Sequence, residues 1–158
     1  MSTDPQRVIF VCTHNSARSQ MAEGMLRTWG GDRFEAFSAG TEATLVRPEA
    51  IHVMDEIGID ISGQESKTLE PFLGGSFNWL ITVCDQAREA CPTIPGVVQQ
   101  AHWSIDDPSA VEGDEKERLA AFRMARDTLR SRIQMFLLAA ARDDLPPPAS
   151  QRIGGEAG

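Results

Sequence analysis

Apolar residues along this chain follow two patterns, short continuous runs and longer stretches with helical spacing. Continuous runs typical of buried strands occupy residues 7–12, 34–38, 78–83 and 97–103, of which the last is the weakest. Helical spacing occupies residues 19–30, 48–57 and 115–141. Because strands alternate with helices, the pattern predicts an α/β fold built on an open parallel sheet. Ligands of such sheets bind beyond the carboxyl ends of the strands.

The predicted helices begin and end at recognisable signals. Gly30-Gly31 ends the first helix, while Pro48 begins the second and Gly58 ends it. The third helix repeats an apolar residue every three or four positions, so we expect it to cover one face of the sheet. The side chains predicted to be core on the first and third helices are Met21, Met25, Leu119, Phe122, Leu129, Ile133 and Phe136.

The length and composition of the chain fit one domain. It has 158 residues, of which 41% are hydrophobic and 24% are charged. We predict one domain over residues 1–142 and a disordered tail over residues 143–158, because the tail is polar and rich in proline. The chain shows no secretory signal and no stretch near the roughly 18 apolar residues of a membrane span, so a cytoplasmic protein is expected.

The charge balance and the cysteine count narrow the classes of partner. A net charge of −8 and a pI near 4.8 argue against nucleic acid and anionic membranes as partners. In a reducing compartment, three cysteines indicate buried thiols, ligands or redox groups rather than a disulfide framework. No metal is expected, because no second Cys or His pair completes a zinc site around Cys84 and Cys91.

The first predicted strand leads directly into a loop that can hold an anion. Cys12 and Arg18 bracket this loop, and a capped helix is expected to follow it. Backbone N–H groups, the helix dipole and the Arg fork can together surround a tetrahedral oxyanion. The same field favours a thiolate at Cys12, and the Ser19 hydroxyl stands within reach of it. The predicted anion-binding residues are Thr13, His14, Asn15, Ser16, Ala17, Arg18 and Ser19.

The spacing of Cys12 and Arg18 is weak evidence by itself. The alternative is a buried structural cysteine beside a surface arginine, and the strand, turn and helix context favours the anion loop over it.

An acid for the reaction is expected in the turn at residues 106–108. Displacing an oxygen from a tetrahedral oxyanion requires a proton for the leaving group. Asp107 is favoured because Pro108 restricts its backbone, but nothing local excludes Asp106. The alternative is an ordinary Asp-Pro loop with no catalytic role.

The remaining cysteines and the histidines are less specific signals. Cys84 and Cys91 can act as a redox pair if their Cα atoms come within about 7 Å, or they are two buried small hydrophobes. His14 lies in the anion loop, and His52 and His102 fit packing or surface roles. We assign no histidine a catalytic role.

Taken in order, the motifs of the chain resemble one family. They are the segments from Cys12 to Ser19, from Ser38 to Gly40 and from His102 to Pro108, together with Cys84 and Cys91. Over roughly residues 7–140 they resemble the thioredoxin-coupled arsenate reductases of the low-molecular-weight protein tyrosine phosphatase superfamily. The resemblance implies a single domain with a four-stranded parallel sheet flanked by helices.

The resemblance also implies a reduction of arsenate to arsenite by three cysteines. Cys12 would attack arsenate held by the loop amides and Arg18, while Asp107 protonates the departing oxygen. Cys84 would then attack the sulfur of Cys12 and release arsenite. Cys91 would leave a Cys84–Cys91 disulfide for thioredoxin, the external reductant, to reduce. No bound cofactor is implied.

Three positions bear on how far the resemblance extends. Asn15 and Ser19 match the residues that support the loop and the thiolate. Some relatives bind potassium nearby, but Lys67 occupies a liganding position here, so an ammonium group can replace the ion. Ala17 stands where some relatives carry another cysteine, which leaves the three relay positions intact.

Two other functions remain open from the sequence. A tyrosine phosphatase would use Cys12, Arg18 and Asp107 but usually carries aromatic residues after the Asp-Pro, where this chain has Ser109-Ala110. Because the residues needed for phosphatase chemistry are present, we expect residual phosphatase activity beside the reductase activity. A non-catalytic module would bind phosphate or arsenate without turnover, and an acid retained beside Cys12 and Arg18 argues against it.

Overall fold

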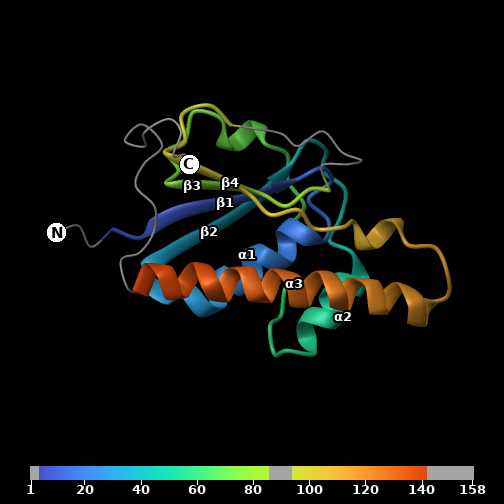
Figure 1. Cartoon of the computed structure of the whole chain (residues 1–158). Helices are drawn as coiled ribbons and strands as arrows, with labels where there is room; N and C mark the ends of the chain where they lie inside the picture. Colours follow the sequence, from blue (N-terminus) through green and yellow to red (C-terminus); the bar gives the residue numbers. More distant parts are fainter. Residues whose placement is uncertain (1–3, 86–93, 142–158) are drawn as a thin grey trace, which may run out of the picture.

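The computed structural model describes residues 4–85 and 94–141, and its centre is a four-stranded parallel sheet in the order β2-β1-β3-β4 (Figure 1). The strands are β1 (Gln6–Cys12), β2 (Phe34–Gly40), β3 (Trp79–Thr82) and β4 (Gln99–His102). The α-helices are α1 (Arg18–Gly30), α2 (Pro48–Asp55) and α3 (Glu115–Ala141). Three short 3₁₀ turns are η1 (Gly31–Arg33), η2 (Glu70–Phe72) and η3 (Pro108–Ala110). The predicted α/β fold with a parallel sheet is confirmed.

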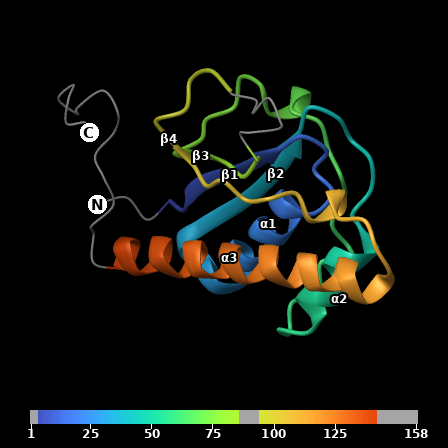
Figure 2. The ribbon, with the colours of Figure 1, turned by 45° about the vertical axis from the view of Figure 1, so that its right-hand side comes forward.

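The two faces of the sheet bury separate apolar clusters. Alternate residues of β1 point to opposite faces, so Val8 and Phe10 pack on one side while Ile9 and Val11 pack on the other. Helices α1, α2 and α3 all lie on the Val8 and Phe10 side, as both views show (Figures 1 and 2). Burial on both faces explains why β1 is an unbroken apolar run rather than an alternating one.

The core side chains predicted from helical spacing lie where they were expected. The following six are buried on the helical face of the sheet: Met21, Met25, Phe122, Leu129, Ile133 and Phe136. Leu119 is partly buried and packs against the same cluster. Helix α3 has the predicted bounds and covers this face of the sheet.

Several bounds and one cap differ from the sequence prediction; α2, for example, ends at Asp55 rather than at residue 57, and β2 continues to Gly40. The edge strand β4 is shorter than the predicted run of residues 97–103, because it pairs with β3 alone. Helix α1 has Ala17 at its N-cap position and no side-chain hydrogen bond there, so the expected cap is wrong. A side-chain cap would compete with a bound anion for the same N–H groups.

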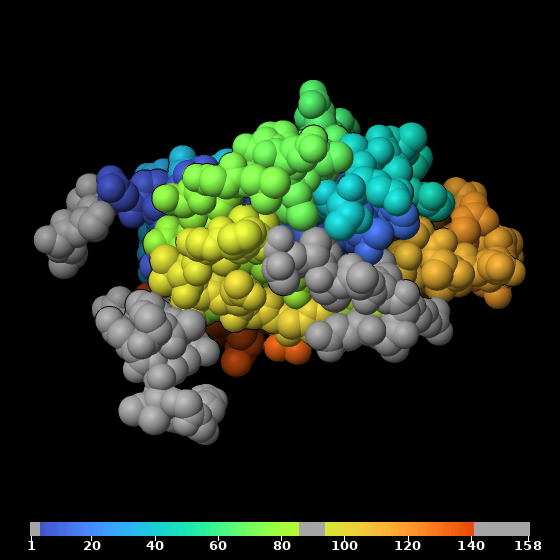
Figure 3. All heavy atoms as spheres, turned by 90° about the horizontal axis from the view of Figure 1, so that it is seen from above, coloured from blue at the N-terminus to red at the C-terminus, as the bar shows by residue number. Residues whose placement is uncertain are grey.

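The register brings the chemistry-bearing segments to one end of the sheet. In the parallel ladder Val11 is paired with Thr82, and Cys12 with Gly40. Figure 3 shows the segment that follows β1, in blue, reaching the surface between the teal segment after β2 and the orange segment before α3. None of the described helices has the length and apolar character needed to cross a membrane. Cys91 and the predicted tail from residue 143 lie outside the described residues.

Candidate active site

The loop from Cys12 to Arg18 is held in a tight curl by contacts to its outer side. Its carbonyl oxygens accept hydrogen bonds from the chain after β2: Thr13 O from Glu42 N (3.0 Å) and Ser16 O from Arg47 N (2.8 Å). Ser66 Oγ also donates to the carbonyl of His14 (3.1 Å). Because these carbonyls are bound from outside, the concave side of the loop is left to its N–H groups, as an oxyanion site requires.

Two backbone features make this curl possible. Asn15 has a φ of +51°, a left-handed conformation that asparagine tolerates better than most residues. Gly40 lies against the loop, where an added Cβ would stand 2.6 Å from Thr13 O and 2.9 Å from Asn15 N. Since those atoms belong to the backbone, they cannot yield as a flexible side chain would. Gly40 is therefore required by the close approach of β2 to the loop.

The thiol of Cys12 lies at the base of the loop and has one hydroxyl partner. Cys12 Sγ is 2.9 Å from Ser19 Oγ, and the cysteine is 2% exposed. Asn15 Nδ2 donates to the same Ser19 oxygen at 2.8 Å. Either Cys12 or Ser19 can donate in this contact while Cys12 is a thiol, but with Cys12 ionised only the Ser19 hydroxyl can donate, and its proton then points to the sulfur. Hydrogen bonds to an ionised sulfur are stronger than those to a neutral thiol, so the arrangement suits a thiolate.

Asn15 connects this thiol to the protein behind it. Its Oδ1 accepts from the backbone N–H of Lys67 (2.7 Å) and from Gln20 Nε2 (2.9 Å), which fixes the orientation of the amide. The residue is fully buried, so each of these bonds replaces one to water. The predicted support of the loop by Asn15 and of the sulfur by Ser19 thus has a clear geometric basis.

A second tier of polar residues lies behind the loop, and one of them, Glu23, was given no functional role from the sequence. Glu23 is 5% exposed and accepts hydrogen bonds from Ser38 Oγ and from Arg27. Lys67 Nζ lies 3.8 Å from Glu23 Oε1, so an ammonium group stands beside the buried carboxylate. The available signal was the spacing of Ser19, Glu23 and Arg27, which places the three side chains on one face of a helix.

Arg18 joins the anion loop to the turn that carries the predicted acid. The arginine is 3% exposed, and its Nη1 donates to the carbonyl of Ile105 at 3.0 Å. Its Nη2 lies 3.8 Å from Asp107 Oδ2. Asp106, in contrast, is exposed to solvent. The structure therefore places Asp107 rather than Asp106 against the anion loop, a choice the sequence left open.

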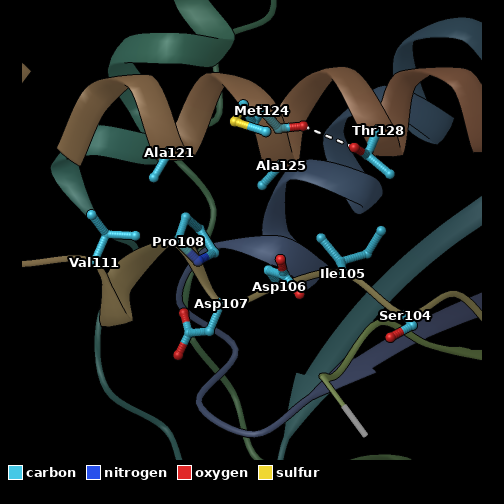
Figure 4. A pocket seen from close by; sticks show the side chains of 10 residues that line it. All are labelled: Ser104, Ile105, Asp106, Asp107, Pro108, Val111, Ala121, Met124, Ala125 and Thr128. Atoms are coloured by element: carbon cyan, nitrogen blue, oxygen red, sulfur yellow. Dashed lines mark hydrogen bonds between the residues drawn. The ribbon is translucent and has the colours of Figure 1, made fainter. Parts of the chain in front are cut away.

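A cavity of about 260 Å³ lies behind this turn, between it and α3. Figure 4 shows the carboxylate of Asp107 turned away from α3. The cavity is lined by Ser104, Ile105, Asp106, Asp107, Pro108, Val111, Ala121, Met124, Ala125 and Thr128.

Cys84 follows β3 at the same end of the sheet as Cys12. Its side chain is fully buried in the apolar cluster that also holds Cys12, and its sulfur is 3.9 Å from the carbonyl of Val11. Since β1 and β3 are neighbours and Val11 pairs with Thr82, Cys12 at the end of β1 and Cys84 just past the end of β3 lie at the same end of the sheet. Two thiols are thus brought to one end of the core, although 72 positions separate them in the sequence.

The side chains of the three histidines have partners other than Cys12, Arg18 and Asp107 in the described part of the chain, although His14 belongs to the anion loop. His14 faces the surface, where its Nε2 is 3.6 Å from Glu42 Oε1. His102 lies at the end of β4 with its Nδ1 2.6 Å from Thr82 Oγ1, and His52 lies on α2 near Glu56. Within residues 4–85 and 94–141, no three His, Cys, Asp or Glu side chains are grouped so that they could hold a metal ion.

Known proteins are similar to this chain in sequence and in fold. The family model described as "Low molecular weight phosphotyrosine protein phosphatase" matches residues 7–145. An arsenate reductase of Halalkalibacterium halodurans is 43% identical over 129 residues, which cover 82% of this chain and 93% of the relative. An arsenate reductase of Bacillus subtilis (strain 168) is 40% identical over the same length and coverage.

A solved structure described as "An arsenate reductase in the phosphate binding state" is similar in fold, with a TM-score of 0.70 and 33% sequence identity. The match covers 84% of this chain and 97% of that structure.

Proposed function

Because this chain belongs to the low molecular weight phosphotyrosine protein phosphatase family, we propose that it is an arsenate reductase that uses Cys12, Cys84 and Cys91 in turn. The observation that carries the proposal is the fully buried thiol of Cys84 just past the end of the strand next to that of Cys12. A phosphatase needs a nucleophile, an Arg and an acid, but it has no use for a second thiol there. The similarity to arsenate reductases over most of the chain supports the same choice.

The first step is a displacement at arsenic. Arsenate is held by the loop N–H groups and Arg18, and the thiolate of Cys12 attacks the arsenic atom. An S–As bond forms as one As–O bond breaks, and the departing oxygen leaves as water with a proton from Asp107. The arsenic remains pentavalent in this step.

The second and third steps transfer the electrons. The thiolate of Cys84 attacks the sulfur of Cys12, and as the S–As bond breaks its electron pair stays on arsenic, which leaves as arsenite. Cys91 then attacks the sulfur of Cys84, restores the Cys12 thiolate and leaves a Cys84–Cys91 disulfide. Both electrons come from the thiols of Cys84 and Cys91.

The oxidised product requires an external reductant. We assign this role to the dithiol of thioredoxin, which takes up the Cys84–Cys91 disulfide by exchange. The scheme needs free thiols at rest and so fits the cytoplasm. The scheme includes no bound metal or cofactor. Arg18 and the N–H dipoles of the loop stabilise the negative charge of arsenate, and the ammonium group of Lys67 stands behind the loop.

The test couples the protein to thioredoxin, thioredoxin reductase and NADPH and follows arsenate-dependent NADPH oxidation. Cys91→Ser should complete one turnover and then stop with a Cys12–Cys84 disulfide. Cys84→Ser should release no arsenite. If Cys91→Ser still cycles with thioredoxin at the full rate, the relay is wrong.

Hydrolysis of an aryl phosphate provides the matched control. This reaction needs Cys12, Arg18 and Asp107 but not the other two cysteines. Any phosphatase activity of the chain should therefore survive Cys91→Ser unchanged and disappear in Cys12→Ser. A chain that hydrolyses aryl phosphate rapidly and fails to reduce arsenate would instead be a phosphatase.

A further inference from the structure

The two carboxylate oxygens of Asp107 have different surroundings. Oδ1 accepts hydrogen bonds from the backbone N–H of Ser109 at 2.9 Å and from Ser109 Oγ at 2.7 Å. Oδ2 is the oxygen that lies 3.8 Å from Arg18 Nη2. One oxygen is therefore occupied by two donors of a single residue, while the other faces the anion loop.

From this asymmetry we propose that Ser109 is a positioning residue, which holds Oδ1 so that the transferable proton of Asp107 resides on Oδ2. The inference rests on the proposed role of Asp107 as the acid. An oxygen that receives two N–H or O–H donors has no favourable place for a proton of its own. The protonated acid therefore carries its hydrogen on Oδ2, the side from which arsenate loses an oxygen.

The backbone of the turn is anchored without the Ser109 hydroxyl. Pro108 is buried, Ile105 O accepts from Arg18 Nη1 at 3.0 Å, and Ala110 N donates to Asp107 O at 3.2 Å. The hydrogen bond from Ser109 N to Asp107 Oδ1 also does not involve the side chain of Ser109. Removing the hydroxyl should therefore leave the turn folded and only loosen the rotation of the carboxyl group.

The proton transfer in question is part of the first displacement. As the S–As bond to Cys12 forms, one As–O bond breaks and the oxygen takes the proton from Oδ2 to leave as water. Asp107 is left as a carboxylate, with Ser109 still bonded to Oδ1. No electron transfer accompanies this step.

The test measures the first-turnover rate of arsenite release at saturating arsenate. Ser109→Ala should lower this rate about fivefold and leave the KM for arsenate unchanged, because one ordinary hydrogen bond is lost from the acid and none from the anion site. Ser109→Thr, which keeps the hydroxyl, should restore the rate. Ser104→Ala is the matched control, since Ser104 is an exposed serine of the same segment, and it should behave as the wild type.

Combination with Asp107→Asn separates positioning from a general structural role. Asp107→Asn alone should reduce the rate strongly, and adding Ser109→Ala should reduce it no further. A further fivefold loss in the double variant would show that Ser109 acts independently of Asp107 and would overturn the proposal. So would a wild-type rate in Ser109→Ala.

The outcome also distinguishes failure of this inference from failure of the proposed function. If Asp107→Asn keeps the full rate, then Asp107 is not the acid and the positioning role of Ser109 falls, while the reduction of arsenate by the chain still stands. If the chain hydrolyses an aryl phosphate but does not reduce arsenate, the same variants are compared on that substrate. The acid step is shared by both reactions, so the positioning role can hold there while the reductase proposal fails.

Discussion

Two polar networks of this protein differ in their groups and in their surroundings, one being buried and neutral and the other partly exposed and charged. Behind the anion loop, fully buried Asn15 is bonded to Ser19, Gln20 and the backbone of Lys67. Between α2 and α3, Glu56 accepts hydrogen bonds from Arg123 (2.7 Å to Nη2) and Arg126 (2.7 Å to Nη1).

The second network is partly exposed, with 32% of the Glu56 side chain and 40% of the Arg123 side chain accessible to solvent. Water competes for every bond of that network, whereas it is excluded from the bonds of Asn15. A buried network fixes atoms in place, and a surface network of charges only adds to helix packing.

The pKa of Glu56 shows what the surface network does. The hydrogen bond from Arg123 is the largest cause that lowers this pKa to about 2. Burial is the next largest effect and opposes it, while the hydrogen bond from Arg126 and the charges of both arginines lower the pKa further. The ionised carboxylate is therefore favoured by folding at neutral pH. This contribution is screened by salt and does not reach the active site.

Asn15→Ala should have the largest effect of the predicted changes. It removes the donor to Ser19 and both bonds to Oδ1, and it places alanine at a φ of +51°. We expect the free energy of unfolding to fall by about 3 kcal/mol and arsenate turnover to fall more than tenfold. Chemical denaturation and the coupled assay measure these quantities. Asn15→Asp keeps the Oδ1 acceptor and should recover much of the stability but not the turnover.

Gly40→Ala should follow in size. The new Cβ would lie 2.6 Å from Thr13 O and 2.8 Å from Cys12 O, so the loop must move outward. We expect a loss of about 2 kcal/mol in stability together with weaker phosphate binding, measured by denaturation and calorimetry. Gly63→Ala is the control, because no atom lies within 4 Å of a Cβ added there. Equal effects of the two changes would contradict the close-approach argument.

Ser19→Ala should affect reactivity more than stability. The variant loses the hydroxyl that lies 2.9 Å from Cys12 Sγ, and it leaves Asn15 Nδ2 without its acceptor. We expect a stability loss of about 1 kcal/mol and slower alkylation of Cys12 by iodoacetamide at neutral pH. Ser19→Thr should retain the wild-type rate. Unchanged alkylation in Ser19→Ala would show that the hydroxyl does not act on the sulfur.

Glu56→Gln should have the smallest effect and should spare arsenate turnover. Because the folded pKa lies near 2 and the ordinary value is 4.5, the stabilisation is fully present above about pH 4.5 and is lost as the pH falls toward 2. The difference in unfolding midpoint between the wild type and the variant should therefore be larger at pH 7 than at pH 3, and smaller again in high salt. A loss of turnover at pH 7 would contradict the separation of the two networks.

Most of the fold could be predicted from local sequence patterns, and the errors in that prediction have a common cause. The bounds of α3 and the buried face of Phe122, Leu129 and Phe136 follow from a 3.6-residue period that depends on nearby residues alone. The length of β4 depends on which strand lies beside it, and the uncapped start of α1 depends on the loop before it. The length of β4 and the uncapped start of α1 thus depend on contacts with other segments, which the sequence of each element does not contain.

The candidate site divides in the same way. Cys12, Arg18 and Ser19 could be named because strand, loop and helix are consecutive in the chain. Glu23 and Gly40 gained their meaning only from the contacts that β2 makes with the loop. Neither residue lies in a motif whose spacing alone states its role.

The sequence by itself determined which residues can take part in chemistry. It also determined the order of strands and helices along the chain, because backbone propensity and apolar periodicity are local properties. The tertiary structure alone decided that Asp107 and not Asp106 faces Arg18, that Cys84 is buried at the same end of the core as Cys12, and that Ser109 occupies one oxygen of the acid. These relations depend on the pairing of β1 with β3 and on the path of the turn before α3. Distances between residues far apart in the chain arise only when the sheet assembles.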